Sequence, residues 1–412
     1  MYENEDKKPR AVLVGVDTDE YDFEESMKEL AELAKTAGAE VACVITQNKD
    51  YIDKATCVGK GKLEEIADYC SKDDIQIVIF DHELTGSQLR NISDVVNTNV
   101  LDRTMLILDI FAQRAKSKEG QLQVELAQQQ YRLPRLIGIG KSLSRQGGGI
   151  GSKGPGETKL ETDKRYIQER ILALKEQIKQ IDKTRVLHRQ RRKKDGVTSV
   201  AIVGYTNVGK STLLNKLTDA GVLSEDMLFA TLDPTARALE LPDGRKVMLI
   251  DTVGLIRRLP HHLVQAFKST LEEAANADLV LNVCDISSDK MHDQIEVTNA
   301  LLSQIGAGGI PVMNVLSKCD KVDQIPLTLD DKTVVISSVT GYGLEDLLSK
   351  IAKNLEPTHK RLSLLLPYSK GNLLSEIRLN GKVYSEEYVE NGIKIDALID
   401  VKILHKVEGY TL

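Results

Sequence analysis

Residues 204–211 read Gly204-Tyr205-Thr206-Asn207-Val208-Gly209-Lys210-Ser211, and this stretch decides the fold. It matches the phosphate-binding loop pattern G-x-x-x-x-G-K-[ST] at every fixed position. The glycines let successive backbone N–H groups surround phosphate oxygens, Lys210 can reach the outer phosphates, and the Ser211 hydroxyl can bind Mg²⁺. An apolar, β-branched run precedes the loop at 197–203, and an amphipathic segment follows it at 212–217. The strand–loop–helix order predicts a nucleotide-binding α/β domain.

A second motif follows an apolar strand at 246–250 and reads Asp251-Thr252-Val253-Gly254. In phosphate-binding loop proteins an acid at this point lies in the outer sphere of the metal, and the glycine N–H contacts the γ-phosphate. We therefore assign Lys210 and Gly254 as catalytic residues, together with Thr231 of the segment that lies between the two motifs. Residues 251–254 as a whole are expected to be part of the nucleotide site.

A segment that senses the triphosphate is expected between these two motifs, where residues 229–233 read Phe229-Ala230-Thr231-Leu232-Asp233. A threonine hydroxyl in this position can bind Mg²⁺ when a nucleoside triphosphate is present. Thr231 is the first candidate, so Ser211 and Thr231 form the predicted metal set. Thr235 is the alternative, and either threonine could instead be a turn residue beside Pro234.

Selection of the base depends on the loop after a third apolar strand, at 310–316. The usual Asn-Lys-x-Asp is here Ser317-Lys318-Cys319-Asp320. The Asp320 carboxylate can accept two hydrogen bonds from guanine, and leaving a buried acceptor unpaired costs about 1–3 kcal/mol, which disfavours adenine. Because Ser317 lacks an amide, we expect GTP to bind with lower affinity than the intact motif would give. Residues Ser337-Ser338-Val339 follow the strand 333–336 and are expected to contact the guanine oxygen through their backbone.

Two further residues bear on hydrolysis. Leu255 occupies the position at which many GTPases carry a glutamine that orients the attacking water, and a leucine cannot do this. The chain is therefore expected to hydrolyse GTP slowly by itself. Asn207 is the residue type that holds a potassium ion in some GTPases. A role in stabilising the loop is equally compatible with the sequence, so K⁺ remains an open alternative.

Composition limits the class of protein. The 412 residues are 41% hydrophobic and 28% charged, as is ordinary for globular chains. The five cysteines, at 43, 57, 70, 284 and 319, lack C-x-x-C spacing and indicate free thiols in a reducing compartment. The N-terminus has no signal-peptide pattern, and no apolar run approaches the roughly 20 residues of a membrane span. We expect a cytoplasmic protein, and nothing suggests an obligate partner copy.

The net charge of −6 conceals an asymmetry. Residues 141–194 contain 16 Lys or Arg and 6 Asp or Glu, so this segment is strongly basic and the rest of the chain acidic. A concentrated basic segment in an acidic protein indicates nucleic-acid binding, although charge runs are often solvated helix faces.

The pattern along the chain predicts an α/β protein of four parts. Residues 1–103 alternate short strands and helices, which indicates an N-terminal parallel α/β domain. Residues 104–195 contain two helical stretches, the second with heptad spacing at Ile167, Ile171, Leu174, Ile178 and Ile181, and predict a long antiparallel helical hairpin. A basic, glycine-rich loop at 138–158 joins them and suits insertion into folded RNA, although a disordered linker is the alternative.

Residues 196–356 form the P-loop GTPase domain. Asp195-Gly196 marks the boundary before the GTPase domain, and Pro357 marks the boundary after it. Residues 357–412 form a small C-terminal α/β domain, whose strand at 393–403 pairs with 381–389.

The order of these parts resembles the HflX family of ribosome-associated GTPases over nearly the whole chain. The resemblance is carried by Asp102-Arg103-Thr104, by Ala115-Lys116-Ser117-Lys118-Glu119-Gly120, by the glycine-rich stretch at 143–161 and by the nucleotide motifs. It implies a Mg²⁺-dependent GTPase that binds the large ribosomal subunit through the hairpin and its loop, with ribosomal RNA stimulating hydrolysis to GDP and phosphate. It also implies ATP binding by the N-terminal domain. Splitting of stalled ribosomes, rescue and subunit maturation all remain open.

Two other functions are weighed. An RNA-binding scaffold or switch on the large subunit, with little hydrolysis, is favoured by Leu255 and Ser317. A regulator of membrane proteolysis has no support, because the chain shows no basic amphipathic membrane helix or lipidation motif.

Overall fold

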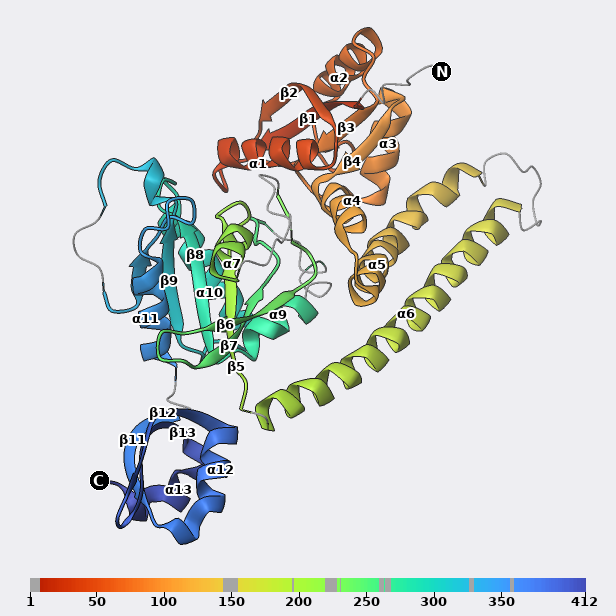
Figure 1. The fold of residues 1–412 in the computed structure, drawn as a ribbon. Helices are drawn as coiled ribbons and strands as arrows, with labels where there is room; N and C mark the ends of the chain where they lie inside the picture. The colour runs from red at the N-terminus through yellow and green to blue at the C-terminus, as the bar shows by residue number, and fades with distance from the viewer. Residues whose placement is uncertain are drawn as a thin grey trace, which may run out of the picture.

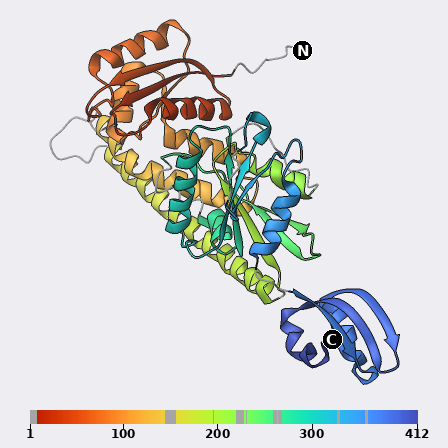
Figure 2. The same cartoon turned by 90° about the vertical axis from the view of Figure 1, so that its left-hand side faces the viewer.

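The computed structural model describes residues 8–143, 155–194, 196–218, 228–229, 231–258, 263, 268–325, 330–355 and 359–412. Figures 1 and 2 show an N-terminal α/β unit, a long helical hairpin, a central α/β unit and a small C-terminal unit. Part of the predicted glycine-rich loop (144–154), Ala230 and the boundary residues Asp195 and Pro357 lie outside the described residues. Within the described part, no helix is both long and apolar enough to cross a membrane.

The N-terminal unit is a four-stranded, wholly parallel sheet in the order β2-β1-β3-β4, which confirms the predicted alternation. Side chains of β1 alternate between two cores: Leu13 faces the cluster that contains α1, whereas Val14 faces that of α2 and α3. A sheet buried on both faces explains why its strands are apolar at consecutive positions. The elements are β1 (Arg10–Asp17), α1 (Phe23–Thr36), β2 (Glu40–Asn48), α2 (Lys60–Lys72), β3 (Ile77–Phe80), α3 (Gly86–Val96) and β4 (Asn99–Asp102).

The middle of the chain is helical, as α4 (Arg103–Arg114), α5 (Lys118–Leu143) and α6 (Pro155–Lys194). Helices α5 and α6 pack side by side and antiparallel (Figure 1), and Ile171 and Leu174 of the predicted heptad are buried. The predicted loop at 138–158 is too long at both ends, because α5 continues to Leu143 and α6 begins at Pro155. Glycine costs a helix about 1 kcal/mol without breaking it, and proline is favoured at the first helical position.

The central unit is a six-stranded sheet in the order β10-β9-β8-β5-β7-β6. All neighbouring strands are parallel except β6 and β7, which form an antiparallel pair at one edge. The phosphate-binding motif joins β5 to α7, as its context predicted. The elements are β5 (Thr198–Gly204), α7 (Lys210–Thr218), β6 (Thr235–Glu240), β7 (Lys246–Asp251), α9 (Lys268–Ala275), β8 (Leu279–Asp285), α10 (Met291–Gln304), β9 (Val312–Ser317), β10 (Thr333–Val335) and α11 (Leu344–Asn354).

The C-terminal unit is a three-stranded antiparallel sheet, in the order β11-β13-β12, with helices against its apolar face. The predicted pairing of residues 381–389 with the alternating strand is confirmed. That strand ends at Asp400, earlier than predicted, because Val401–Ile403 forms a 3₁₀ turn. The elements are β11 (His359–Leu366), α12 (Gly371–Asn380), β12 (Gly381–Val389), β13 (Gly392–Asp400) and α13 (Leu404–Val407).

Candidate nucleotide-binding and hydrolysis site

The phosphate-binding loop wraps from the end of β5 to the start of α7. Gly204, Asn207 and Gly209 all have positive φ angles, of 148°, 60° and 93°. A side chain at Gly204 would overlap the carbonyl group of Val283, so only glycine fits there. The Lys210 side chain is buried, and its Nζ donates a hydrogen bond to the Tyr205 carbonyl oxygen at 2.7 Å. Burial lowers the pKa of Lys210 to about 8, although the nearby Asp251 carboxylate acts in the opposite direction.

Three oxygen-bearing side chains converge beside this loop. The Ser211 hydroxyl oxygen lies 2.7 Å from the Thr231 hydroxyl oxygen and 2.7 Å from Asp251 Oδ2, and the Thr231 hydroxyl donates to the same carboxylate oxygen at 3.0 Å. Asp251 is fully buried, its Oδ1 has no hydrogen-bond partner among the residues that the structure describes, and burial raises its pKa. Hydroxyl and carboxylate oxygens with spare acceptor capacity are the donor set that Mg²⁺ prefers, so these residues fit the metal. Thr235, the alternative, begins the edge strand β6 and pairs with Asp251 through the sheet.

Gly254 lies directly against the phosphate-binding loop. A Cβ atom there would be 2.7 Å from Thr206 Cγ2 and 3.1 Å from Lys210 Nζ. The next residue, Leu255, pairs with the loop through its backbone: its N–H donates to Gly204 at 3.1 Å, and its carbonyl accepts from Thr206 at 2.8 Å. Its side chain is 5% exposed. The position that could orient water is therefore an apolar side chain packed into the core.

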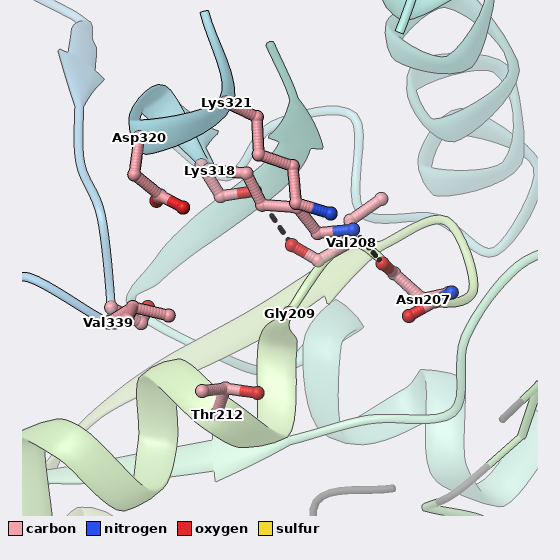
Figure 3. Close-up of a pocket in the computed structure, with 10 residues that line it drawn as sticks. Asn207, Val208, Gly209, Thr212, Lys318, Asp320, Lys321 and Val339 are labelled. Carbon is pink, nitrogen blue, oxygen red and sulfur yellow. Dashed lines mark hydrogen bonds between the residues drawn. The ribbon is translucent and has the colours of Figure 1, made fainter. Parts of the chain in front are cut away.

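A cavity of about 290 Å³ opens on the other side of the loop (Figure 3). Asp320 and Val339 lie along one side of it, and the phosphate-binding loop forms the opposite wall. The Ser337 hydroxyl donates to Asp320 Oδ1, so this serine orients the carboxylate rather than lining the cavity. The Cys319 side chain is buried in a small apolar core with Cys284. The full lining is Asn207, Val208, Gly209, Thr212, Ser317, Lys318, Asp320, Lys321, Ser338 and Val339.

Ser317, which replaces the usual asparagine, still braces the phosphate-binding loop. Its hydroxyl lies 2.7 Å from the Val208 carbonyl oxygen and 3.0 Å from the Cys284 carbonyl oxygen. Lys318 adds a second brace, because its Nζ donates to the Asn207 carbonyl oxygen at 2.6 Å and pairs with Asp285 at 2.8 Å. Ser317 therefore does contact the phosphate-binding loop, through its hydroxyl, and the expected loss of GTP affinity stays a prediction.

Only Thr231 among the described residues of the predicted 229–233 segment directs its side chain to the metal set. Phe229 is buried and meets Phe111 of α4 edge to face, with ring centroids 4.6 Å apart. Leu232 is also buried. Asp233 turns to the start of α5, where it accepts hydrogen bonds from the Lys116 and Ser117 N–H groups at 2.9 and 2.7 Å. Contacts of these three residues with a nucleotide would thus have to come from their backbone.

The segment after Gly254 makes contacts that sequence reasoning missed. The Tyr205 hydroxyl donates to Glu29 of α1 and accepts from the Arg257 N–H. Arg258 pairs with Asp81, at the end of β3, at 2.6 Å, and its guanidinium stacks on the ring of Tyr21. The available signal was weak: an Asp-His pair directly after an apolar strand, at the edge of a parallel sheet where ligand groups often lie.

Part of the basic charge of α6 is used inside the protein. Arg185 pairs with Glu272 of α9 at 2.5 Å and with Glu119 of α5 at 3.1 Å. Arg189 and Arg192 both pair with Glu273, at 3.3 and 3.4 Å. These ion pairs join the hairpin to the central unit, so some of the basic residues counted in 141–194 are already paired within the protein. Among the α6 side chains whose burial the structure describes, the exposed basic ones are Lys164, Arg165, Lys175, Lys179, Lys183 and Arg191.

Comparison with known proteins accounts for most of the chain. Residues 24–112 and 114–192 match family models described as the N-terminal and middle regions of GTP-binding GTPases, and residues 199–318 match one described as a 50S ribosome-binding GTPase. The crystal structure of the SsGBP and GDP complex superposes with a TM-score of 0.50 and 26% identity, over 84% of this chain and 98% of that one.

Two curated relatives match this chain in sequence over most of their length. GTPase HflX from Caldanaerobacter subterraneus subsp. tengcongensis is 50% identical, over 98% of this chain and 94% of the relative. GTPase HflX from Escherichia coli K12 is 40% identical, over 95% and 93%. Together with the phosphate-binding loop and its cavity, these matches show that the chain belongs to the HflX family of GTPases.

Proposed function

We propose that the chain is a Mg²⁺-dependent GTPase that binds the large ribosomal subunit and remodels ribosomes. Splitting or rescue of stalled ribosomes and subunit maturation are the candidate tasks. The matched family description of residues 199–318 and the long hairpin that contacts the central unit support this proposal. We further propose that the protein acts as a monomer in the cytoplasm. The divisions at 103/104, 195/196 and 356/357 are the proposed domain boundaries.

In this proposal the chain's own residues divide the work on the triphosphate. Lys210 neutralises the outer phosphates, and the Gly254 N–H contacts the γ-phosphate. Ser211 and Thr231 would hold Mg²⁺ with Asp251 behind them, and the ion would supply charge for the developing transition state. Asn207 could also hold a potassium ion, and equal turnover in potassium and sodium buffers would remove that idea.

Base recognition is assigned to the cavity beside the phosphate-binding loop. Asp320 lines it with a carboxylate held in place by Ser337, so it is oriented before guanine arrives. Ser338 and Val339 line the same cavity and would contact the guanine oxygen through their backbone. An acceptor oriented in this way favours guanine over other bases, because an incorrect base leaves the acceptor unpaired.

The single observation that carries the proposal is Leu255. The residue that would orient water is apolar and packed into the core, so the chain lacks this part of the hydrolytic machinery at that position. A slow GTPase with a long appended hairpin is explained if the ribosome completes the site. GTP turnover should therefore be measured with and without purified large subunits, with ATP as a control. Stimulation of at least about tenfold, equivalent to ~1.4 kcal/mol of barrier, is expected. Absence of stimulation would contradict ribosome-assisted catalysis.

A second candidate is an RNA-binding scaffold or switch that hydrolyses GTP only to reset binding. The exposed basic face of α6 favours it, since phosphate contacts alone can provide affinity for RNA. Dissociation of ribosomes with substoichiometric protein separates the two candidates. Several ribosomes split per protein molecule require turnover, whereas a stoichiometric limit favours the scaffold.

A further inference from the structure

Asp233, two residues after Thr231, binds the two residues that immediately precede helix α5. Its carboxylate accepts from the Lys116 N–H at 2.9 Å, from the Ser117 N–H at 2.7 Å and from the Ser117 hydroxyl. Ser117 is itself the N-cap, because its hydroxyl accepts from the Gly120 N–H at 2.9 Å. The first N–H groups of a helix lack partners within the helix and attract negative charge. A residue from the nucleotide-sensing segment thus completes the start of a hairpin helix.

The segment is fastened a second time on the other side of Thr231. Phe229 packs edge to face on Phe111 of α4 at an interplanar angle of 79°, and both rings are buried. Phe229 has a φ angle of 56°, which a bulky residue adopts only where its surroundings hold it. Thr231 therefore lies between two anchors, Phe229 and Asp233, each two residues away. Phe229 contacts α4, and Asp233 contacts the start of α5.

Gly120 makes the first anchor sterically specific. A Cβ atom at this position would overlap Asp233 Oδ1. Glycine within a helix is less favourable than alanine, so nothing in α5 itself calls for it. The absent side chain is explained by the carboxylate that occupies its space.

We propose that Ser117 and Gly120 are positioning residues for the GTP-bound site: they fix Asp233, and through it Thr231, so that the site and the hairpin are coupled. The inference rests on the proposed role of Thr231 in the GTP-bound site. Helix α5 has 26 residues and spans about 39 Å, so a small change at its first turn becomes a large displacement at its far end. Coupling between two sites is reciprocal. If GTP changes the affinity of the hairpin for a partner by some factor, that partner changes the affinity for GTP by the same factor.

Gly120→Ala is the central variant, and Gly61→Ala is its matched control. Gly61 is also a helix glycine, in α2, but a Cβ atom there would meet nothing within 4 Å. Two properties are measured in the full chain: hydrogen exchange of the Lys116 and Ser117 amides, and affinity for GDP and for a non-hydrolysable GTP analogue in Mg²⁺.

Gly120→Ala is expected to speed exchange at both amides and to weaken analogue binding by about tenfold, as for loss of a helix cap, with GDP affinity within about twofold. Ser117→Ala should produce the same changes to a smaller extent. Combining Gly120→Ala with Asp233→Ala should add little to Asp233→Ala alone, because both remove one contact. Gly61→Ala should change none of these values.

Unchanged exchange and an unchanged ratio of analogue to GDP affinity in Gly120→Ala would overturn the inference. Thr231→Ala distinguishes this outcome from failure of the proposed function. If Thr231→Ala weakens analogue binding but Gly120→Ala does not, the coupling is wrong and the role of Thr231 stands. If Thr231→Ala itself has no effect on analogue binding, the proposed role of Thr231 is wrong, and the coupling argument falls with it.

Discussion

Tyr205 links the phosphate-binding loop, the segment after Gly254 and the N-terminal unit, and Tyr205→Phe tests that link. The phenol is 8% exposed. Its hydroxyl donates to Glu29 and accepts from the Arg257 N–H, and the Glu29 carboxylate also pairs with the buried Arg103. The substitution removes one oxygen atom and keeps the ring, so it deletes these two hydrogen bonds with little change in packing.

The expected magnitude follows from the charge and burial of the groups left behind. A hydrogen bond to a charged group contributes about 1.5–3 kcal/mol, and the second bond adds up to about 1 kcal/mol if Arg257 finds no new partner. Because the Arg257 N–H also lies close enough to Glu29 to interact with it, we take about 2 kcal/mol in total. A change of this size corresponds to about 30-fold in the local opening equilibrium.

Hydrogen exchange of the Arg257 amide is the assay, because it reports the opening of this segment alone. Tyr205→Phe should accelerate that exchange by about 30-fold and leave GDP affinity within about twofold, since Tyr205 does not line the cavity. The control is Tyr166→Phe, the same chemical change at an exposed tyrosine of α6. Unchanged protection of Arg257 in Tyr205→Phe would refute the assignment of the hydroxyl as the link.

Three further predictions concern single residues. Ser317→Ala should weaken GDP binding by about 5- to 30-fold in calorimetry, because the buried carbonyl of Val208 loses its donor, whereas equal affinity would show that the brace is dispensable. Gly254→Ala should weaken binding of a GTP analogue by at least about tenfold, because its Cβ would be 2.7 Å from Thr206; unaltered binding would contradict the close packing seen here. Burial lowers the pKa of His82 in the folded chain, so the unfolded chain binds the imidazole proton more tightly than the folded chain does. The free energy of unfolding therefore decreases as the pH falls below 6.5. His82→Gln should reduce the acid-induced fall in the urea midpoint, and an identical fall in both proteins would count against His82.

Local pattern was sufficient for the strands, helices and loops near the nucleotide. The alternation of β1 to β4 and the context of the phosphate-binding loop are matched closely, because periodicity and glycine spacing are properties of neighbouring residues. Side-chain direction within a motif was less accessible. Cys319 and Asp320 are adjacent, but one enters an apolar core while the other faces the cavity. The metal-binding and base-binding roles of these residues stay predictions.

Contacts between distant segments could not be predicted in this way. Tyr205 and Glu29 are separated by 176 positions, and Asp233 and Ser117 by 116. Each of these residues has an ordinary local explanation, such as a turn aspartate or a core tyrosine. Their partners depend on how separately folded parts pack together, which no local period records.

Two segments of the nucleotide site contact the N-terminal half of the chain, and these contacts give a physical reason why hydrolysis would depend on a partner. The segment around Thr231 is fastened to α4 and α5, and the segment after Gly254 is fastened to α1 and β3. A nucleotide that reorganises either segment changes whether these contacts with the N-terminal half are kept or broken. A contact worth about 2 kcal/mol shifts the equilibrium between the two arrangements about 30-fold. If the proposed coupling holds, a partner that engages the hairpin or the N-terminal unit would act on the nucleotide site without touching it. Since Leu255 leaves no water-orienting side chain at its position, control through these anchors and completion of the site can both come from the same partner, as the proposed ribosomal role requires.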